Sequence, residues 1–464
     1  MPLILGTNSI KDTGYNVANS LRFNSGDSPS LSRTSGGSPS STTKGTFSFW
    51  LKRSKLGIND RFVTTNSLSD PYFQMYFDSN ASRLDQIRLQ CYNGSDGSVL
   101  ELITNQKFRD NSAWYNIILS YDSTPSTPSS SSIKLFVNGT QVTSFATATY
   151  PSQNQNHYFN QGLMRLSGYG ASSSDHTDGY MAEVVYCDGQ ALNADSFGEF
   201  DSDSPTIWKP IDVSGLTFGT NGFYLDFEDS SSLGNDAAGS NNFTVNNLTA
   251  IDQSTDTCTN NFATFNPLDK TGTGAPTGSE GNLKLTGDAS SNNTWNSTIG
   301  LSAGKWYVEM KVLQSSPDTS IVFRSQTNTS GSHNNSYGFD CNPDRKMING
   351  SASGSAIGST SQNDILGMAL DLDNGKMFIH RNGTYLSSGD PANGTNPFIQ
   401  TSDGMPTEGV IGGHIYNGSV EWNFGSPSFA ISSGNADGNG YGNFEYSVPS
   451  GYFALCTKNL AEFG

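Results

Sequence analysis

Several carboxylates in this sequence have a spacing that could support chemistry. Asp371, Asp373 and Gly375 resemble the start of a DxDxDG calcium loop. An EF-hand needs a glutamate at the twelfth position of that loop and helices on both sides, and the twelfth residue here is Asn382, inside another turn. We therefore interpret residues 371–375 as an acidic turn between two strands.

A second candidate is the loop 172–179, where Asp175, His176 and Asp178 come close together in the sequence. Carboxylates at alternating positions, with carbonyls and water, could hold Ca²⁺. Polar loops of this composition usually bind no ion, so we expect no metal and no cofactor, and calcium at Asp175 to Asp178 stays the alternative. The 5 histidines are too scattered for a zinc site, and no GxSxG elbow is present.

Glycoside hydrolysis offers a third kind of chemistry, because it needs two carboxylates that face one sugar. Glu199 with Asp201 and Asp226 with Glu228 have the required alternate spacing. Neither pair has the third carboxylate of an ExDxxE pattern, and neither lies in a strand expected to be concave. We predict no catalytic residue, and the ligand-binding residues stay unknown at this stage.

Composition sets the class of fold. Of 464 residues only 14% are charged, the net charge is -17, and 50 glycines accompany 11% aromatic residues. Aromatic and β-branched residues form short runs separated by Gly, Ser and Asn, which indicates an all-β protein with many turns. An acidic chain repels phosphate backbones, so we expect no nucleic-acid partner.

The termini and cysteines bear on the compartment. The start, MPLILGTNSIKD, lacks the basic residues of a signal peptide, and no segment is apolar enough to span a bilayer, so we expect no membrane insertion. The odd number of cysteines without CxxC spacing predicts buried or half-buried free thiols in a reducing cytoplasm. The NxS/T triplets at Asn138, Asn382 and Asn417 then mark turns rather than glycans.

Strand-like runs suggest two antiparallel β-sandwiches joined by a turn-rich connector. We predict an N-terminal arm (1–20) that docks on a partner, followed by a first sandwich (21–210) and a connector (211–272). A second sandwich (273–430) and a C-terminal return segment (431–464) complete the chain. We expect Trp295, Trp306 and Trp422 to fill the second core, and the return segment to pair with residues 223–227.

Three resemblances add to this reading. The runs FSFWLK, WYNIILSYD, IKLFVNG and AEVVYCDGQAL resemble a LamG-type concanavalin A-like jelly roll. The runs KWYVEMKV, LDLDNGKMF and EWNFGSPSF resemble a SPRY-like domain, which implies a binding module without catalytic residues. The runs GFYLDFEDSSSLGND, TNNFATFNP and GYFALCTKNL resemble predicted structural proteins of marine phages.

Together these features predict a non-enzymatic phage virion surface protein, in a tail fibre, tip or capsid decoration, whose sandwich loops adhere to host glycan or protein. It would fold in the host cytoplasm, function on the particle, contact other virion proteins through its N-terminal arm, and form a homo-oligomer. One alternative is a glycan-cleaving depolymerase of the concanavalin A-like fold, and another is a purely architectural virion protein.

Overall fold

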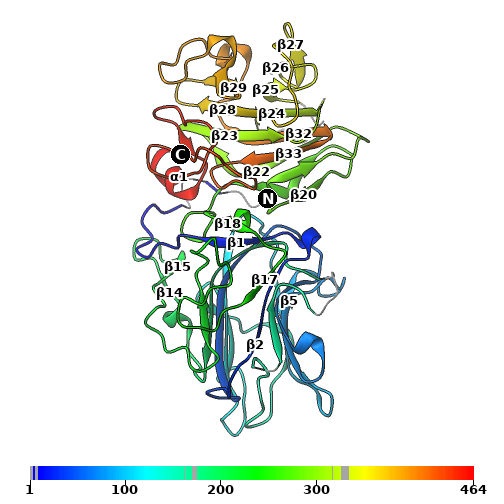
Figure 1. The fold of residues 1–464 in the computed structure, drawn as a ribbon, viewed down its shortest axis with the longest axis vertical. Coiled ribbons are helices and arrows are strands. Elements are labelled where there is room, and N and C mark those ends of the chain that lie inside the picture. Colours follow the sequence, from blue (N-terminus) through cyan, green and yellow to red (C-terminus); the bar gives the residue numbers. More distant parts are fainter. Residues whose placement is uncertain (1–3, 6–8, 161, 170–174, 316, 326–333) are drawn as a thin grey trace. The chain divides into compact units, whose positions relative to one another are not determined.

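The computed structural model describes residues 4–5, 9–160, 162–169, 175–315, 317–325 and 334–464. The chain divides into an N-terminal unit, residues 13–259, and a C-terminal unit, residues 260–464 together with the described part of 1–12. The division falls inside the expected connector 211–272. The fold is all-β, as the composition predicts (Figure 1).

In the N-terminal unit, one antiparallel sheet has the order β10-β9-β8-β3-β13-β1-β18, and β16 also pairs with β13. Its strands are β1 (Ser20–Phe23), β3 (Lys44–Arg53), β8 (Trp114–Asp122), β9 (Ile133–Val137), β10 (Thr140–Gln141), β13 (Gly179–Asp188), β16 (Phe223–Leu225) and β18 (Gln253–Ser254). The short strand β16 shows that the first part of the expected connector belongs to this sandwich.

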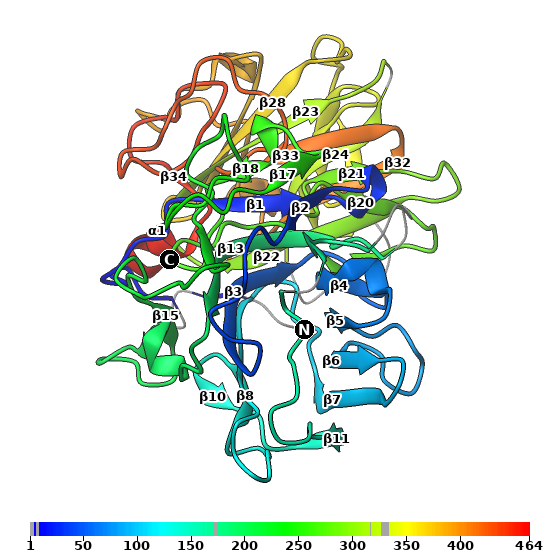
Figure 2. The same cartoon turned by 60° about the horizontal axis from the view of Figure 1, so that its bottom comes forward.

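The opposing sheet has the order β11-β7-β6-β5-β4-β12-β2-β17. Its strands are β2 (Ser30–Thr34), β4 (Asp60–Thr65), β5 (Tyr72–Phe77), β6 (Gln86–Asn93), β7 (Gly97–Lys107), β11 (Phe145–Thr149), β12 (Leu163–Leu166) and β17 (Thr244–Asn246). Figure 2 shows β4 to β7 side by side, with β11 beyond β7. A separate hairpin joins β14 (Gly198–Phe200) to β15 (Trp208–Pro210).

Period-two patterning builds the core between these sheets. Phe73, Met75 and Phe77 on β5 face Phe47 and its neighbours on β3, and these side chains are fully buried. Each such side chain contributes about 1.5–3 kcal/mol to folding. The alternate residues of β5 must therefore lie on the opposite face of the sheet, away from the core.

The C-terminal unit is a second pair of sheets. One has the order β19-β22-β32-β24-β25-β26-β27, with β19 (Phe265–Thr271), β22 (Asn293–Leu301), β24 (Asp318–Arg324), β25 (Ser336–Asp340), β26 (Arg345–Ile348), β27 (Ser351–Ser353) and β32 (Gly409–Asn417). The other has the order β20-β21-β33-β23-β28-β29-β30, with β20 (Thr277–Ser279), β21 (Lys284–Thr286), β23 (Lys305–Val312), β28 (Ile365–Asp371), β29 (Lys376–Arg381), β30 (Thr384–Tyr385) and β33 (Ser419–Asn423). Two further strands pair with members of this sheet, β31 (Ile399–Gln400) with β29 and β34 (Phe453–Ala454) with β23.

The helical elements of the described residues are short. They are the 3-10 turns η2 (Ser25–Asp27), η3 (Asn66–Leu68), η4 (Ala194–Ser196), η5 (Ala250–Asp252), η6 (Leu386–Ser388) and η7 (Thr401–Asp403), and the helix α1 (Thr457–Phe463). No helix in the described part of the chain has the length and apolar character needed to cross a membrane.

Several predictions about the turn, the core and the cysteines are confirmed. The acidic turn joins β28 to β29 as a hairpin, and Asp371 is used within it, accepting a hydrogen bond from the Asn374 backbone N–H at 3.0 Å and pairing with the Lys305 ammonium at 3.0 Å. The three tryptophans expected in the core lie there. The five cysteines are free thiols, and four of them are buried.

The pairing expected for the return segment is wrong. Phe223–Leu225 pairs with β13 in the N-terminal unit, whereas β34 of the return segment lies parallel to β23 in the C-terminal unit. Tyr452, Ala454 and Cys456 bury their side chains beside Tyr307 of β23, and this apolar contact stabilises the observed pairing.

The N-terminal segment contacts the C-terminal unit of the same chain at the described residues Ile4 and Lys11. Ile4 forms a parallel bridge with Ile299, donating its N–H to the Thr298 carbonyl and accepting from the Gly300 N–H, both at 3.0 Å. Lys11 pairs with Glu462 at 2.7 Å. Contacts within the chain therefore hold Ile4 and Lys11 in place without a second chain. Docking of the arm on a virion partner stays a prediction.

Candidate functional site

The face of β4 to β7 that points away from the core carries polar and aromatic residues at alternate positions. We name this set the platform: Arg61, Tyr72, Gln74, Tyr76, Arg88, Gln90, Tyr92, Ser98 and Glu101. The strand register sets these residues opposite one another, because directly paired residues of an antiparallel sheet share a face. The result is three cross-strand rows.

The first row joins Arg61, Tyr76 and Arg88. The Arg61 guanidinium lies over the Tyr76 ring at 4.4 Å from its centroid, and Arg88 donates to the Tyr76 hydroxyl at 2.8 Å. Arg88 also pairs with Glu101 of β7 through its Nη2 at 2.5 Å. The two arginines cover the tyrosine, which is buried although it points away from the core.

The second row is a chain of amides. Gln74 accepts a short hydrogen bond from Arg61 and donates through Nε2 to the Gln90 Oε1 at 2.7 Å. Gln90 in turn donates to the Ser98 hydroxyl at 2.5 Å. Since both glutamines are buried and bonded on both sides, their orientation is fixed, and they support the groups above them.

The third row is a pair of tyrosines. The Tyr72 and Tyr92 rings stack with centroids 5.2 Å apart and an interplanar angle of 16°. Both rings are half-buried, and the Tyr72 hydroxyl donates to the Gln90 Oε1 at 3.4 Å. Half-buried stacked rings offer an apolar surface with polar edges, which suits the faces of a sugar ring.

Electrostatics keep Tyr72, Tyr76 and Arg88 of the platform in one protonation state. Burial raises the pKa of the Tyr76 hydroxyl, and burial together with the neighbouring Tyr92 raises the pKa of Tyr72. Burial by itself would lower the pKa of Arg88, but Tyr76 and Glu101 outweigh it and raise that pKa. Tyr72 and Tyr76 therefore stay neutral and the Arg88 guanidinium stays charged at ordinary pH.

The two carboxylates at the platform are both paired with arginines. The platform's exposed groups are guanidinium, carboxylate and ring: the side chain of Arg88 is 21% exposed and that of Glu101 is 19% exposed. Glu101 is paired with Arg88, and Asp175, the carboxylate bonded to Arg61 at 3.1 Å, is paired as well. Neither carboxylate is left as a free acid or nucleophile.

The residues of the calcium candidate, Asp175, His176 and Asp178, instead contact other parts of the N-terminal unit. Asp175 pairs with Arg61, His176 lies 2.9 Å from the Pro29 carbonyl, and Asp178 accepts from the Ser25 hydroxyl at 2.6 Å. The three side chains have different partners, and the described residues contain no group of three or more His, Cys, Asp or Glu suited to a metal. Part of the loop, residues 172–174, lies outside the described residues.

The paired carboxylates at alternate positions occupy turns and a surface hairpin. Glu199 and Asp201 on and beside β14 both contact the Lys209 ammonium, at 3.3 and 3.4 Å. Asp226 accepts from the Glu228 backbone N–H at 3.1 Å. Asp229 and Asp236 accept similar bonds from the backbone N–H groups two residues on, so the turn-capping role predicted for these three aspartates is confirmed.

A buried polar cluster occurs in the C-terminal unit, centred on Glu309. Its carboxylate accepts from the backbone N–H groups of Glu445 at 3.0 Å and Tyr446 at 2.8 Å, and from the Tyr307 hydroxyl at 3.1 Å. Tyr307 in turn contacts the His380 Nε2 at 2.6 Å. Burial raises the pKa of Glu309 and lowers the pKa of His380 to about 3. The cluster is closed to solvent and is suited to holding the C-terminal segment.

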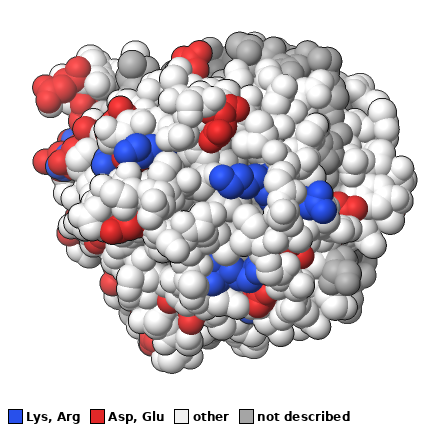
Figure 3. Space-filling model, turned by 90° about the horizontal axis from the view of Figure 1, so that it is seen from above, with Lys and Arg blue, Asp and Glu red and all other residues white. Residues whose placement is uncertain are grey.

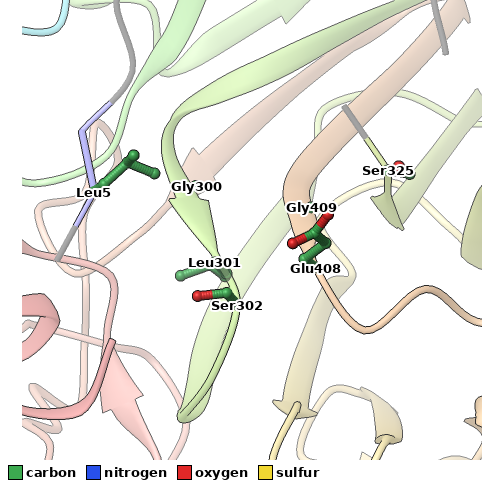
Figure 4. Close-up of a pocket in the computed structure, with 7 residues that line it drawn as sticks. All are labelled: Leu5, Gly300, Leu301, Ser302, Ser325, Glu408 and Gly409. Atoms are coloured by element: carbon green, nitrogen blue, oxygen red, sulfur yellow. The ribbon is translucent and has the colours of Figure 1, made fainter. Parts of the chain in front are cut away.

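A pocket of about 290 Å³ also lies in the C-terminal unit (Figure 4). Leu5, Leu301 and Glu408 are among its lining residues, with glycine and serine between them. It has one charged side chain and no ring, so it offers less specific chemistry than the platform. Figure 3 shows one face of the molecule, where charged residues are scattered between large uncharged areas.

Comparison with known proteins agrees with the fold of the N-terminal unit. Residues 24–196 match the concanavalin A-like lectin/glucanases superfamily. This range contains every residue of the platform. The sequence matches no curated protein.

Solved structures resemble parts of the chain at low identity. The SPRY domain of human HERC1 is 13% identical, with 34% of this chain and 96% of that domain covered and a TM-score of 0.28. A proposed carbohydrate-binding protein from Bacteroides ovatus ATCC 8483 is 15% identical, with 50% and 59% covered and a TM-score of 0.36. Domain 4 of the arabinanase AbnA from Geobacillus stearothermophilus, solved with arabinotriose, is 13% identical, with 33% and 64% covered and a TM-score of 0.23. At these scores we draw nothing about ligand or activity from them.

The platform itself was missed by the sequence reasoning, although a signal was present. On β5 and β6 the polar and aromatic residues alternate with apolar ones, as in Tyr72, Gln74 and Tyr76 between Phe73 and Met75. Alternation predicts which residues share a face, but a solvated face of lysines and serines would alternate in the same way. Only the register shows that rings, amides and guanidinium groups meet.

Proposed function

We propose that this chain is a non-enzymatic protein of a phage virion surface that binds carbohydrate of the host through the platform. The observation that carries the proposal is the platform's chemistry, a stacked tyrosine pair beside fixed amides and a guanidinium–carboxylate pair. It lies inside the range that matches the concanavalin A-like lectin/glucanases superfamily.

Binding would combine stacking with hydrogen bonds. The half-buried rings of Tyr72 and Tyr92 would contact the apolar face of a sugar, while Arg88 and Glu101 would donate to and accept from its hydroxyls. The buried glutamines would keep these groups in place, which lowers the entropy cost of binding. Weak single sites would give firm attachment when several copies on one particle engage together.

The virion location is supported by the sequence. The runs GFYLDFEDSSSLGND, TNNFATFNP and GYFALCTKNL resemble structural proteins of marine phages. Release of the particle by lysis is also consistent with free cysteines in a polar, glycine-rich sequence, because such a protein folds in a reducing cytoplasm and functions outside it.

The experiment is a pull-down of purified protein on intact host cells, with host polysaccharide as competitor. We expect saturable binding that the polysaccharide blocks, a loss of at least tenfold in Tyr72→Ala and Tyr92→Ala, and no change in Tyr416→Ala, a half-buried strand tyrosine of the C-terminal unit. EDTA should leave the binding unchanged. Binding that survives in both platform variants would contradict the proposal, and release of reducing ends from the polysaccharide would favour the depolymerase.

A further inference from the structure

A groove of about 600 Å³ runs along one open edge of the N-terminal sandwich, apart from the three rows of the platform. The hairpin of β9 and β10 forms one wall and the end of β7 forms the other, together with the segment that leads into β11. β10 and β11 lie at the same end of this unit in Figure 2. The volume lies within the range of about 300–1,000 Å³ that is usual for ligand sites.

The lining is neutral and rich in hydrogen-bonding side chains. Asn105, Gln106, Asn138, Thr140, Gln141 and Thr143 supply amides and hydroxyls, and no lining residue is charged. A neutral, hydroxyl-rich molecule could therefore enter this groove without taking any ionised lining side chain out of water.

Part of the lining is held rigidly. Asn138 and Gly139 form the two-residue turn between β9 and β10, both with positive φ, and Asn138 accepts from the Asn116 backbone N–H at 2.8 Å. A Cβ on Gly139 would lie 2.3 Å from the Trp208 ring, so this position requires glycine. Gln141 donates to the Ser130 carbonyl at 2.8 Å. One wall of the groove is thereby fixed.

Other lining side chains are available. Gln106, Thr140 and Thr143 lie at exposed positions, and their side chains form no hydrogen bond with any residue that the structure describes. A groove of about 360 Å³ in the same unit differs, because its charged member Arg33 is already bonded to Asn241 at 2.5 Å. Fixed walls with unused donors and acceptors are what a hydroxyl-rich ligand requires.

We infer that this groove is a second carbohydrate subsite, which takes a neutral, hydroxyl-rich oligosaccharide. The inference rests on the proposed carbohydrate binding but not on the platform. Since no aromatic ring lines the groove, hydrogen bonds and bridging waters supply its affinity. Asn105 follows Glu101 of the platform by four residues on β7, about 13 Å along the strand, so both sites can act on one host surface.

The test measures oligosaccharide binding to the full chain by saturation-transfer NMR and calorimetry. The probes are maltohexaose, cellohexaose and mannohexaose, with hexagalacturonate as the charged counterpart. In Thr140→Val/Thr143→Val the shape is kept and two hydroxyls are removed, and Thr143→Trp fills the groove. Thr149→Val, on β11 but outside the lining, is the matched control.

We expect at least one neutral hexasaccharide to bind, with a Kd three- to tenfold weaker in the double valine variant, no detectable binding at the groove in Thr143→Trp, and no change in Thr149→Val. Tyr72→Ala should leave this component intact. If oligosaccharide binding were lost in Tyr72→Ala while the groove variants bound like wild type, the groove would not be a binding site, whereas binding by the platform would be supported. Preference for hexagalacturonate, or no neutral binding at all, would overturn this inference, whereas cell binding tests the proposed function separately.

Discussion

The platform of the N-terminal unit and the Glu309 cluster of the C-terminal unit are built from similar side chains, yet they differ in exposure. On the platform the side chains of Arg88 and Glu101 are 21% and 19% exposed. In the cluster Glu309, Tyr307 and His380 are 0%, 0% and 1% exposed.

The difference lies in which partners satisfy the polar groups. The carboxylate of Glu309 uses its oxygens on the chain itself, including two backbone N–H groups of the C-terminal segment. On the platform, Arg88 and Glu101 are still partly exposed to solvent after forming their own contacts. A polar network whose hydrogen-bond partners all come from the chain stabilises the fold. A network in which solvent supplies some of the partners can exchange that solvent for a ligand.

The largest expected effect comes from removing the buried carboxylate. Glu309→Ala leaves the N–H groups of Glu445 and Tyr446 without their acceptor inside the protein, so we expect the free energy of unfolding to fall by about 3–5 kcal/mol. Chemical denaturation followed by tryptophan fluorescence measures it. Glu309→Gln keeps one acceptor oxygen and should lose less. A loss below 1 kcal/mol in Glu309→Ala would show that solvent reaches these groups.

The second-largest effect is expected from low pH, which should lower the stability of the fold through His380. Its pKa is about 3 in the folded chain against 6.5 ordinarily, so the unfolded chain binds a proton that the folded chain does not between those values. Stability therefore falls as pH drops from about 6.5 towards 3, by about 3 kcal/mol at pH 4 from this group. The measurement is the difference in unfolding free energy between wild type and His380→Gln across that window. A difference that does not change with pH would contradict the prediction.

A smaller effect is expected where the polar group is partly exposed. Arg88→Met removes the bonds to Tyr76 and Glu101, and we expect a loss of about 1 kcal/mol in stability because water replaces part of what is lost. Host-cell binding should fall about fivefold or more in the same variant, with thermal unfolding as the control for folding. A large loss of stability with unchanged host-cell binding would show that Arg88 stabilises the fold and does not bind the ligand.

Binding by the platform should hardly respond to pH. The pKa values of Tyr72, Tyr76 and Arg88 are all raised above their ordinary values, so none of the three changes charge between about pH 5 and pH 9. Cell binding measured across this range should vary less than about twofold. A steep change would point to a different group at the site.

The smallest expected effect is at Glu199, whose side chain is 60% exposed beside Lys209. Glu199→Gln should alter stability by no more than about 0.5 kcal/mol and leave cell binding unchanged. If wild type released reducing ends from host polysaccharide and Glu199→Gln abolished that release, the non-enzymatic proposal would be wrong.

The sequence by itself determined the all-β class, the hairpin of β28 and β29, the core position of Trp306 and Trp422, and the turn-capping role of the aspartates after β16. These features depend on contacts between residues close in sequence, or on apolar side chains that any sandwich must bury. Local patterns carry that information directly.

The tertiary structure decided the rest. Pairing of β34 with β23 and of Ile4 with Ile299 joins residues far apart in the chain, and many strands here have similar patterns and could serve as partners. The platform depends on register across β4 to β7, because a shift by one residue would turn its rings and amides into the core. Register is set by the packing of both sheets together, which no single strand encodes.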